Sequence, residues 1–86
     1  MAKFESNKEF MLALAGLINR WCEQRALRQL ALILPEYLAF NGMSDGWYEL
    51  HASFGRLRGL GPDSYEPSDW RAVIDLLNTI DRMLFP

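Results

Sequence analysis

Hydrophobic residues recur at helical spacing along most of the chain, and the clearest case is the segment 44–59. Its apolar residues fall at i, i+3, i+7 and i+10, one stripe of a helix with 3.6 residues per turn: Trp47, Leu50, Phe54 and Leu57. Ser44 can cap this helix by accepting a hydrogen bond from a backbone N–H, and Asp45 adds negative charge at the positive end of the helix dipole. Gly59 suits a left-handed residue just after the last turn. The segment therefore predicts a complete helix.

The residues before this segment predict two more helices. The first runs from about Asn7 to Glu23, with Ser6 or Asn7 as its cap, and its apolar face consists of Phe10, Leu14, Leu17, Ile18 and Trp21. A turn is expected near Cys22–Gln24, and one long helix across this point is the alternative, because no Gly or Pro separates the two segments. In the second helix we expect Arg25, Arg28 and Gln29 to face outward, and these residues to face inward: Leu27, Leu30, Ala31, Leu34 and Leu38.

Pro35 interrupts the second helical pattern. Proline has no N–H to donate to the carbonyl of Ala31 and its ring crowds that carbonyl, at a cost of about 3 kcal/mol in a helix interior. The residue before a proline, here Leu34, is also driven away from helical geometry. We therefore expect the second helix to end or kink at Ile33–Leu34, and Asn41-Gly42 to form the turn that leads into the next helix.

The last part of the chain contains a loop and a fourth helix. Residues 59–67 show no periodicity and include two Gly and two Pro, which is typical of a loop. Ser68 can cap the helix that follows, whose inward residues are predicted as Trp70, Val73, Ile74, Leu77, Ile80 and Leu84. No alternating pattern typical of a strand persists. The sequence predicts one all-α domain, residues 1–86, folded as a small four-helix bundle with its second helix kinked or broken at Pro35.

Charge and cysteine content narrow the choice of partner and compartment. The net charge is −2, without the basic excess typical of nucleic-acid-binding domains, and residues 36–86 alone carry −4, which suits a basic partner. Cys22 is the only cysteine, so no disulfide can form within the chain and a cytoplasmic location is expected. No apolar run approaches the ~18 residues of a membrane span.

Few residues are suited to catalysis or metal binding. Cys22 and His51 are the only residues of their kinds and could form a thiol–imidazole pair, but each lies within a helical pattern, where a structural role is expected. A metal site needs three or four clustered ligands, which one His and one Cys on different helices do not supply. We expect no enzyme activity, no cofactor and no metal.

Aromatic and acidic residues near the third helix suggest a protein-binding surface. Tyr48 lies about 100° from Trp47 around the helix, so it should be exposed if Trp47 is buried. Tyrosine and tryptophan are enriched where proteins bind one another. The predicted partner-binding residues are Asp45, Tyr48, Glu49, Tyr65 and Glu66. Tyr65 and Glu66 join this surface only if the 59–67 loop folds back along the helix.

The leading hypothesis is a small acidic protein that acts through protein–protein interaction on a protein partner of basic character. A stoichiometric inhibitor or immunity-type protein is one member of this class. We also expect a homodimer at micromolar concentrations through the first two helices, because a small domain rarely leaves a large apolar surface open. One alternative function is that this dimer is structural and has no other partner. The other is a helix-turn-helix regulator that uses Arg20, Arg25, Arg28 and Gln29, although the net charge argues against nucleic acid as a partner.

Overall fold

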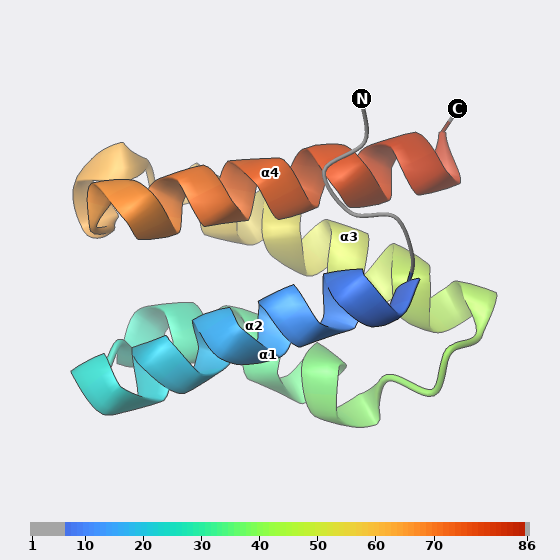
Figure 1. The fold of residues 1–86 in the computed structure, drawn as a ribbon, viewed down its shortest axis with the longest axis horizontal. Coiled ribbons are helices and arrows are strands. Elements are labelled where there is room, and N and C mark those ends of the chain that lie inside the picture. The colour runs from blue at the N-terminus through green and yellow to red at the C-terminus, as the bar shows by residue number, and fades with distance from the viewer. Residues whose placement is uncertain (1–6, 86) are drawn as a thin grey trace.

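The computed structural model describes residues 7–85, which form four α-helices and one short 3-10 helix (Figure 1). The helices are α1 (Asn7–Gln24), α2 (Leu27–Ala39), α3 (Ser44–Gly59), η1 (Pro62–Ser64) and α4 (Pro67–Leu84). No strand occurs within residues 7–85, so the predicted all-α class is confirmed. The predicted cap at Ser6 lies outside the described residues.

The most extensive helix contacts are α1 with α2, α2 with α3, α3 with α4, and α4 with α1. The Phe10 ring of α1 also packs against Trp47 and Phe54 of α3. Figure 1 shows α4 along the top of the molecule and α1 along the bottom, with α3 between these two levels. This pattern of contacts is compatible with the predicted four-helix bundle.

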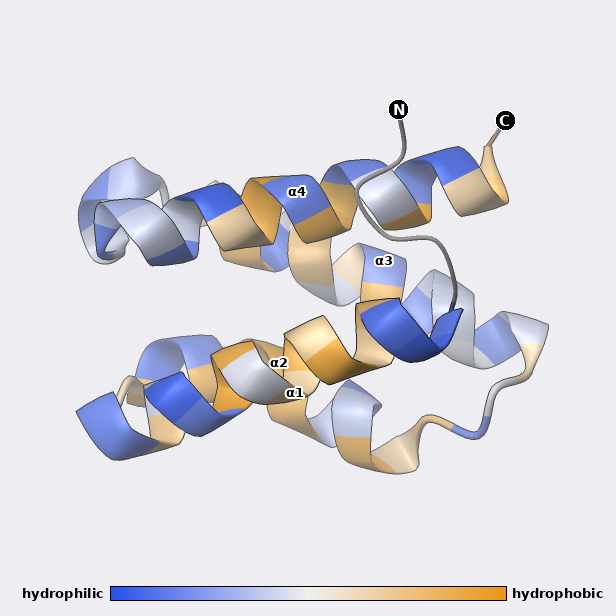
Figure 2. Cartoon of the chain, in the orientation of Figure 1, coloured by the Kyte–Doolittle hydropathy of each residue, from blue (hydrophilic) through white to orange (hydrophobic). Residues whose placement is uncertain are grey.

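All four helices contribute side chains to one hydrophobic core. The five predicted core residues of α1 and the four of α3 are all buried, as expected from their spacing. In α4, Val73, Leu77 and Ile80 are buried as predicted, and Leu76 is an additional core residue. Figure 2 shows the alternation of hydrophobic and hydrophilic residues along α4 that produces this one-sided burial. Within residues 7–85, no helix combines the length and apolar character needed to cross a bilayer.

The predicted orientation of α2 is wrong at four positions, whereas Leu30 is buried and Arg28 is exposed as predicted. Leu27 and Leu38 are each 72 % exposed, and Ala31 is exposed too, whereas Gln29, predicted to face outward, is buried. The buried positions are Gln29, Leu30 and Ile33, with Ala26, Tyr37 and Phe40 packed beside them. The reason is that α2 has two apolar stripes, and hydrophobicity alone does not decide which one faces the core.

Pro35 lies inside a continuous α2. The helix does not end at Ile33–Leu34, because it extends from Leu27 to Ala39. Pro35 is exposed, so its ring points away from the core. A kink at this position stays a prediction.

Two predicted helix caps are wrong. Met43 and Glu66 precede α3 and α4 in extended conformation, and neither Ser44 nor Ser68 caps a helix with its side chain. Pro67 is the first residue of α4, where its fixed φ suits a helix start and its missing N–H would in any case have had no partner. Because Ser68 was taken as the cap, the start of α4 was predicted too late.

The chain reverses between helices at residues with positive φ. Gly42 (φ 83°) forms the expected turn before α3. Gly61 (φ 85°), not Gly59, has the left-handed conformation after α3, since α3 includes Gly59.

The first turn lies at Arg25 (φ 56°), just after the predicted 22–24, so α1 and α2 are separate helices. The N–H groups of Arg25 and Ala26 donate to the carbonyls of Cys22 and Trp21, which satisfies the end of α1.

Candidate functional site

Three of the five predicted partner-binding residues lie together on the outer face of α3. Asp45, Tyr48 and Glu49 are exposed at i, i+3 and i+4, and they line a shallow hollow with Ala52 and Arg56. Tyr48 is 49 % exposed, while its neighbour Trp47 is buried, as the helical spacing predicts. The ring of Tyr48 packs edge-on against Phe85, with centroids 6.0 Å apart.

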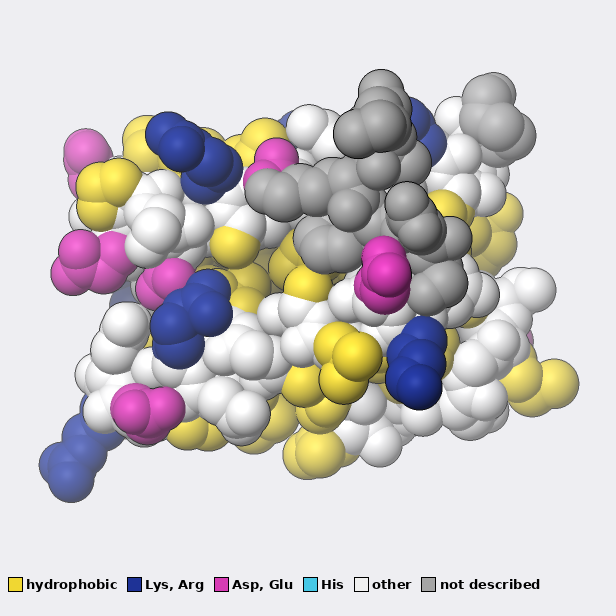
Figure 3. All heavy atoms as spheres, in the orientation of Figure 1, with side chains coloured by type: hydrophobic (Ala, Val, Ile, Leu, Met, Phe, Trp, Pro, Cys, Tyr) yellow, Lys and Arg dark blue, Asp and Glu magenta, His cyan; other side chains and the backbone are white. Residues whose placement is uncertain are grey.

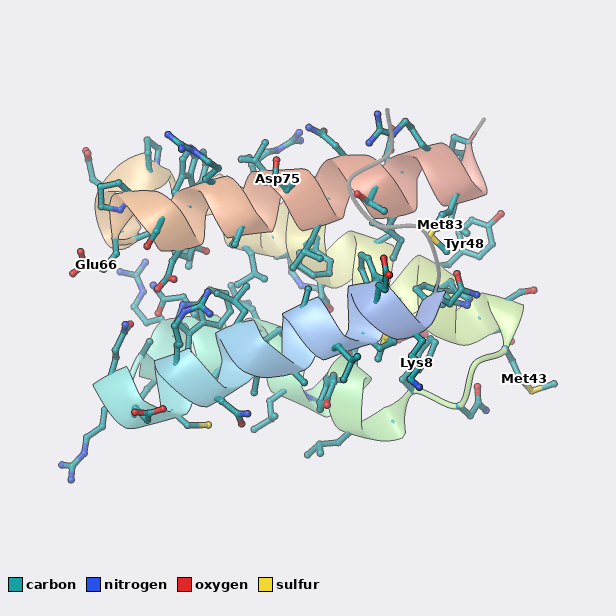
Figure 4. The ribbon with its side chains drawn as sticks, viewed as in Figure 1. Lys8, Met43, Tyr48, Glu66, Asp75 and Met83 are labelled. Atoms are coloured by element: carbon teal, nitrogen blue, oxygen red, sulfur yellow. The ribbon has the colours of Figure 1, made fainter. Side chains whose placement is uncertain are left out.

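Tyr65 and Glu66 do not join these three residues. Figure 4 shows Glu66 and Tyr48 at opposite ends of the molecule. The hydroxyl of Tyr65 donates to the carbonyl of Leu57 at 2.7 Å, which fixes Tyr65 beside the last turns of α3. Leu57 follows Tyr48 by nine residues, about 13 Å along a helix. The 59–67 loop therefore does not fold back along α3 toward Tyr48.

Tyr65 is part of a different cluster, which lines a second hollow beside η1. Its ring lies 5.9 Å from that of Trp21 and 5.5 Å from that of Trp70. Burial raises the pKa of the Tyr65 phenol to about 12, and the positive charge of Arg28 opposes this rise. Tyr65 is therefore neutral at physiological pH and acts there as a hydrogen-bond donor.

Buried polar side chains surround Tyr65. Asp69, in the first turn of α4, is only 2 % exposed. Its Oδ1 accepts a hydrogen bond from Nε of Arg20 at 3.2 Å and lies 3.2 Å from Nη2 of the same guanidinium in an ion pair. Gln29 donates from Nε2 to the carbonyl of Ser64 at 2.8 Å. We call this set the Tyr65 cluster: Arg20, Trp21, Gln29, Tyr65, Asp69 and Trp70. Asp69 was not predicted from the sequence, where its only signal was a carboxylate in the first turn of a helix.

A groove lies where α2 and α3 meet at their connection. Its nine lining residues come from the end of α2, the connection and the first turns of α3: Pro35, Glu36, Ala39, Phe40, Asn41, Met43, Asp45, Gly46 and Glu49. We call this the α2–α3 groove. It encloses about 300 Å³, and among residues 7–85 its lining includes three carboxylates and no basic side chain.

Local sequence explains how this groove forms. Gly42 has the positive φ that reverses the chain, and Asn41 Oδ1 accepts the Met43 N–H at 3.0 Å. Gly46 lets the Phe40 ring approach α3, because a Cβ at position 46 would lie 2.9 Å from Phe40 Cδ1. Phe40 also packs edge-on against Trp47, with centroids 4.8 Å apart. The floor of the groove is thus joined to the core.

The sequence analysis identified only part of this groove. Asp45 and Glu49 were predicted from their spacing on α3, but Met43 was not. The Asn41-Gly42 turn was the available signal, since a tight turn brings the residues before and after it together.

Cys22 and His51 do not form a thiol–imidazole pair. His51 is half-buried, with Nε2 2.9 Å from Asp81 Oδ1 and its ring 5.3 Å from that of Phe85. Cys22 is exposed on α1 and is not a core residue. Among residues 7–85, no group of three His, Cys, Asp or Glu side chains is placed to hold a metal ion.

The basic residues proposed for helix-turn-helix recognition do not share one exposed face. Gln29 is buried and bonded to Ser64, and Arg20 pairs with Asp69. On the face that Figure 3 shows, acidic and basic side chains are interspersed. Comparison of the chain with protein-family models, curated proteins and solved structures found no match.

Proposed function

We propose that this protein is a non-enzymatic binding protein that takes a basic protein partner into the α2–α3 groove. The observation that carries this proposal is the charge of the lining: Glu36, Asp45 and Glu49 surround an apolar floor, with no basic side chain among them. Complementary charge speeds the encounter of two proteins and selects the partner. A cytoplasmic inhibitor of a basic protein is the function that fits this surface best.

The shape of the groove suits one long basic side chain. Lysine and arginine lay their aliphatic stems on apolar surface and keep the charged group at a polar edge. Phe40 and Pro35 supply apolar surface, and Asp45 and Glu49, one turn apart on α3, supply the carboxylates. The exposed ring of Tyr48 lies on the same face of α3 and extends the contact surface beyond the groove.

A bend of α2 at Pro35 belongs to the same proposal. Without an N–H at Pro35, the Ala31 carbonyl lacks its helical partner, which favours a bend at this turn. In a four-helix bundle, such a bend directs the last turn of α2, with Glu36 and Phe40, toward α3. An experimental structure with an axis bend below ~20° at Pro35 would count against this part.

The test uses two variants that remove the same number of charges at opposite ends of the molecule. One is Asp45→Asn with Glu49→Gln in the groove, and the other is Asp63→Asn with Glu66→Gln at exposed positions near η1. Each protein is used to capture partners from its native host, and a captured partner is then titrated against both variants. We expect the groove variant to bind about 10- to 100-fold more weakly and the η1 variant to bind like the wild type.

Equal loss in both variants would show that overall negative charge, not the groove, attracts the partner. No loss in either would remove the groove from the proposal. Unfolding in urea should give similar midpoints for both variants, since all four positions are exposed.

A second candidate function is self-association through the apolar surface of α1 and α2. The observation that favours it is the exposure of three leucines on these helices: Leu12 at 63 %, and Leu27 and Leu38 at 72 % each. Light scattering over a concentration series tests this candidate, because the mass should rise from 10.0 kDa toward twice that value. A monomer mass at high protein concentration would count against it.

A further inference from the structure

The hollow beside η1 lies where the end of α1 and the starts of α2 and α4 come together (Figure 1). Its volume is about 540 Å³, and we call it the η1 hollow. Among residues 7–85 its lining includes no basic side chain and three carboxylates: Asp63, Glu66 and Asp69. Figure 4 shows Glu66 at this end of the molecule and Tyr48 at the other. The η1 hollow is therefore separate from the α2–α3 groove.

The floor of the η1 hollow contains buried oxygen acceptors that the chain does not use. Asp69 is 2 % exposed and Gln29 is 8 % exposed, and both line the hollow. Asp69 accepts a hydrogen bond from Arg20 through Oδ1, and Gln29 donates from Nε2 to the carbonyl of Ser64. Within residues 7–85, Asp69 Oδ2 and Gln29 Oε1 accept no hydrogen bond, and neither atom is sealed from solvent. Both oxygens can therefore accept hydrogen bonds from a ligand in the hollow.

The rim of the η1 hollow is acidic. Asp63 and Glu66 are exposed, and neither forms an ion pair within residues 7–85. Arg20 is held by Asp69, and the positive charge of Arg28, which is outside the lining, acts on the neighbouring phenol. Three carboxylates thus outnumber the two guanidinium groups near them. This excess of negative charge favours a cation in the hollow.

Two aromatic side chains give the same hollow an apolar surface. Trp21 and Tyr65 both line it, and their ring centroids are 5.9 Å apart. Trp21 is buried, and the hydroxyl of Tyr65 is bonded to the carbonyl of Leu57, so both rings are held in place. The alkyl chain of an amine can pack on such rings while its charged end stays at polar groups.

We propose that the η1 hollow binds a linear alkyl diamine. An ammonium group has three N–H donors and no acceptor, which matches the oxygen acceptors of the floor. One ammonium group donates to Asp69 and Gln29, and the other, at the far end of the alkyl chain, pairs with the rim carboxylates. Hydrogen bonds between an ammonium and a carboxylate are stronger than those between neutral groups. This site is independent of the protein partner proposed for the α2–α3 groove.

The test is a titration with 1,4-diaminobutane at low salt, where charges are least screened. NMR signals of residues 63–69 and of the Gln29 side-chain amide report binding at this site, and we expect them to shift until saturation. 1-Aminobutane lacks the second charge and should bind about fivefold more weakly. Bis(trimethylammonium)butane keeps both charges but has no N–H donor, so it should bind about tenfold more weakly.

A variant of the rim tests the second ammonium contact. Asp63→Asn with Glu66→Gln should weaken the binding of 1,4-diaminobutane about fivefold, to the level of 1-aminobutane. The matched control, Asp45→Asn with Glu49→Gln, removes the same number of charges at the other end of the molecule. It should leave the affinity measured from residues 63–69 unchanged. All four positions are exposed, so we expect both variants to fold, and circular dichroism verifies this.

Several results would overturn the proposal. If the signals of residues 63–69 do not shift, or only signals from the α2–α3 groove shift, the diamine does not bind in the η1 hollow. Equal affinity of the wild type for 1,4-diaminobutane and 1-aminobutane would exclude the rim contact. Equal affinity for the trimethylammonium compound would exclude hydrogen bonding to the floor. None of these results would affect the function proposed for the groove, which is tested with a protein partner.

Discussion

The α2–α3 groove and the Tyr65 cluster contain the same kinds of side chain and use them differently. Both combine carboxylates with aromatic rings. In the Tyr65 cluster the polar atoms bond within the chain, as Asp69 with Arg20 and Tyr65 with Leu57 show. Both regions line a hollow, but Asp45 and Glu49 of the groove are exposed, whereas Asp69 of the Tyr65 cluster is buried. Acidic and aromatic composition alone therefore does not identify a binding surface, since a cluster of this kind can be used to hold helices together.

The largest expected effect on the free energy of unfolding distinguishes Trp47 from Tyr48, two adjacent aromatic residues on α3. Trp47 is buried against Phe10 and Phe40, so Trp47→Ala should lower the free energy of unfolding by about 3–5 kcal/mol. Tyr48→Ala should lower it by less than about 1 kcal/mol, because half of the side chain is exposed. If Tyr48 contacts the partner centrally, its truncation should instead cost about 2 kcal/mol of binding free energy.

Urea unfolding of both variants, together with titration of the partner, measures these effects. Equal destabilisation by the two changes would place Tyr48 in the core and remove it from the binding surface. Glu23→Ala, an exposed change on α1, is the control for binding.

Part of this contrast was predictable from the sequence. The spacing on α3 predicted that Trp47 is buried and that Asp45, Tyr48 and Glu49 share the outer face, because a single apolar stripe fixes the orientation of a helix. It did not predict the place of Tyr65 and Glu66, since the path of a loop has no periodicity. The orientation of α2 was predicted only in part, for the opposite reason: its apolar residues fit two faces, and only packing against α1 and α3 selects one.

The second expected effect concerns the ion pair of the Tyr65 cluster. Arg20→Met keeps the aliphatic stem but leaves the buried carboxylate of Asp69 without its basic partner. We expect a loss of about 3 kcal/mol in unfolding free energy, at the lower end for a broken buried pair because Arg20 is half exposed. Arg71→Met, at an exposed arginine on α4, should change stability by less than about 0.5 kcal/mol. Partner binding in the groove should be unchanged in both, and a tenfold loss in Arg20→Met would contradict the separation of the two regions.

A smaller effect is expected at the Tyr65 hydroxyl. Tyr65→Phe removes the hydrogen bond to Leu57 and should cost about 1 kcal/mol of unfolding free energy near neutral pH. The pKa of Tyr65 is near 12 in the folded state and 10 in the unfolded chain, so the unfolded chain alone loses the proton between these values. The wild type should therefore lose stability as the pH rises from 10 to 12, whereas Tyr65→Phe lacks this contribution. Parallel pH profiles for the two proteins in this window would contradict the burial of the phenol.

The smallest effect on the free energy of unfolding is expected at Gly46. The same substitution tests the role of the Phe40 ring in the groove. Replacing a helical glycine by alanine usually stabilises by roughly 0.5–1 kcal/mol, because alanine has less freedom in the unfolded chain. Gly55→Ala should show this gain, since nothing lies within 4 Å of the added Cβ. At Gly46 the added Cβ meets the Phe40 ring at 2.9 Å, so the ring must move and the gain should largely disappear. Because Phe40 is the floor of the groove, Gly46→Ala should weaken partner binding while Gly55→Ala leaves it unchanged. Equal stabilisation and unchanged binding in both variants would show that the Phe40 ring yields without cost and that its position does not determine how the groove binds.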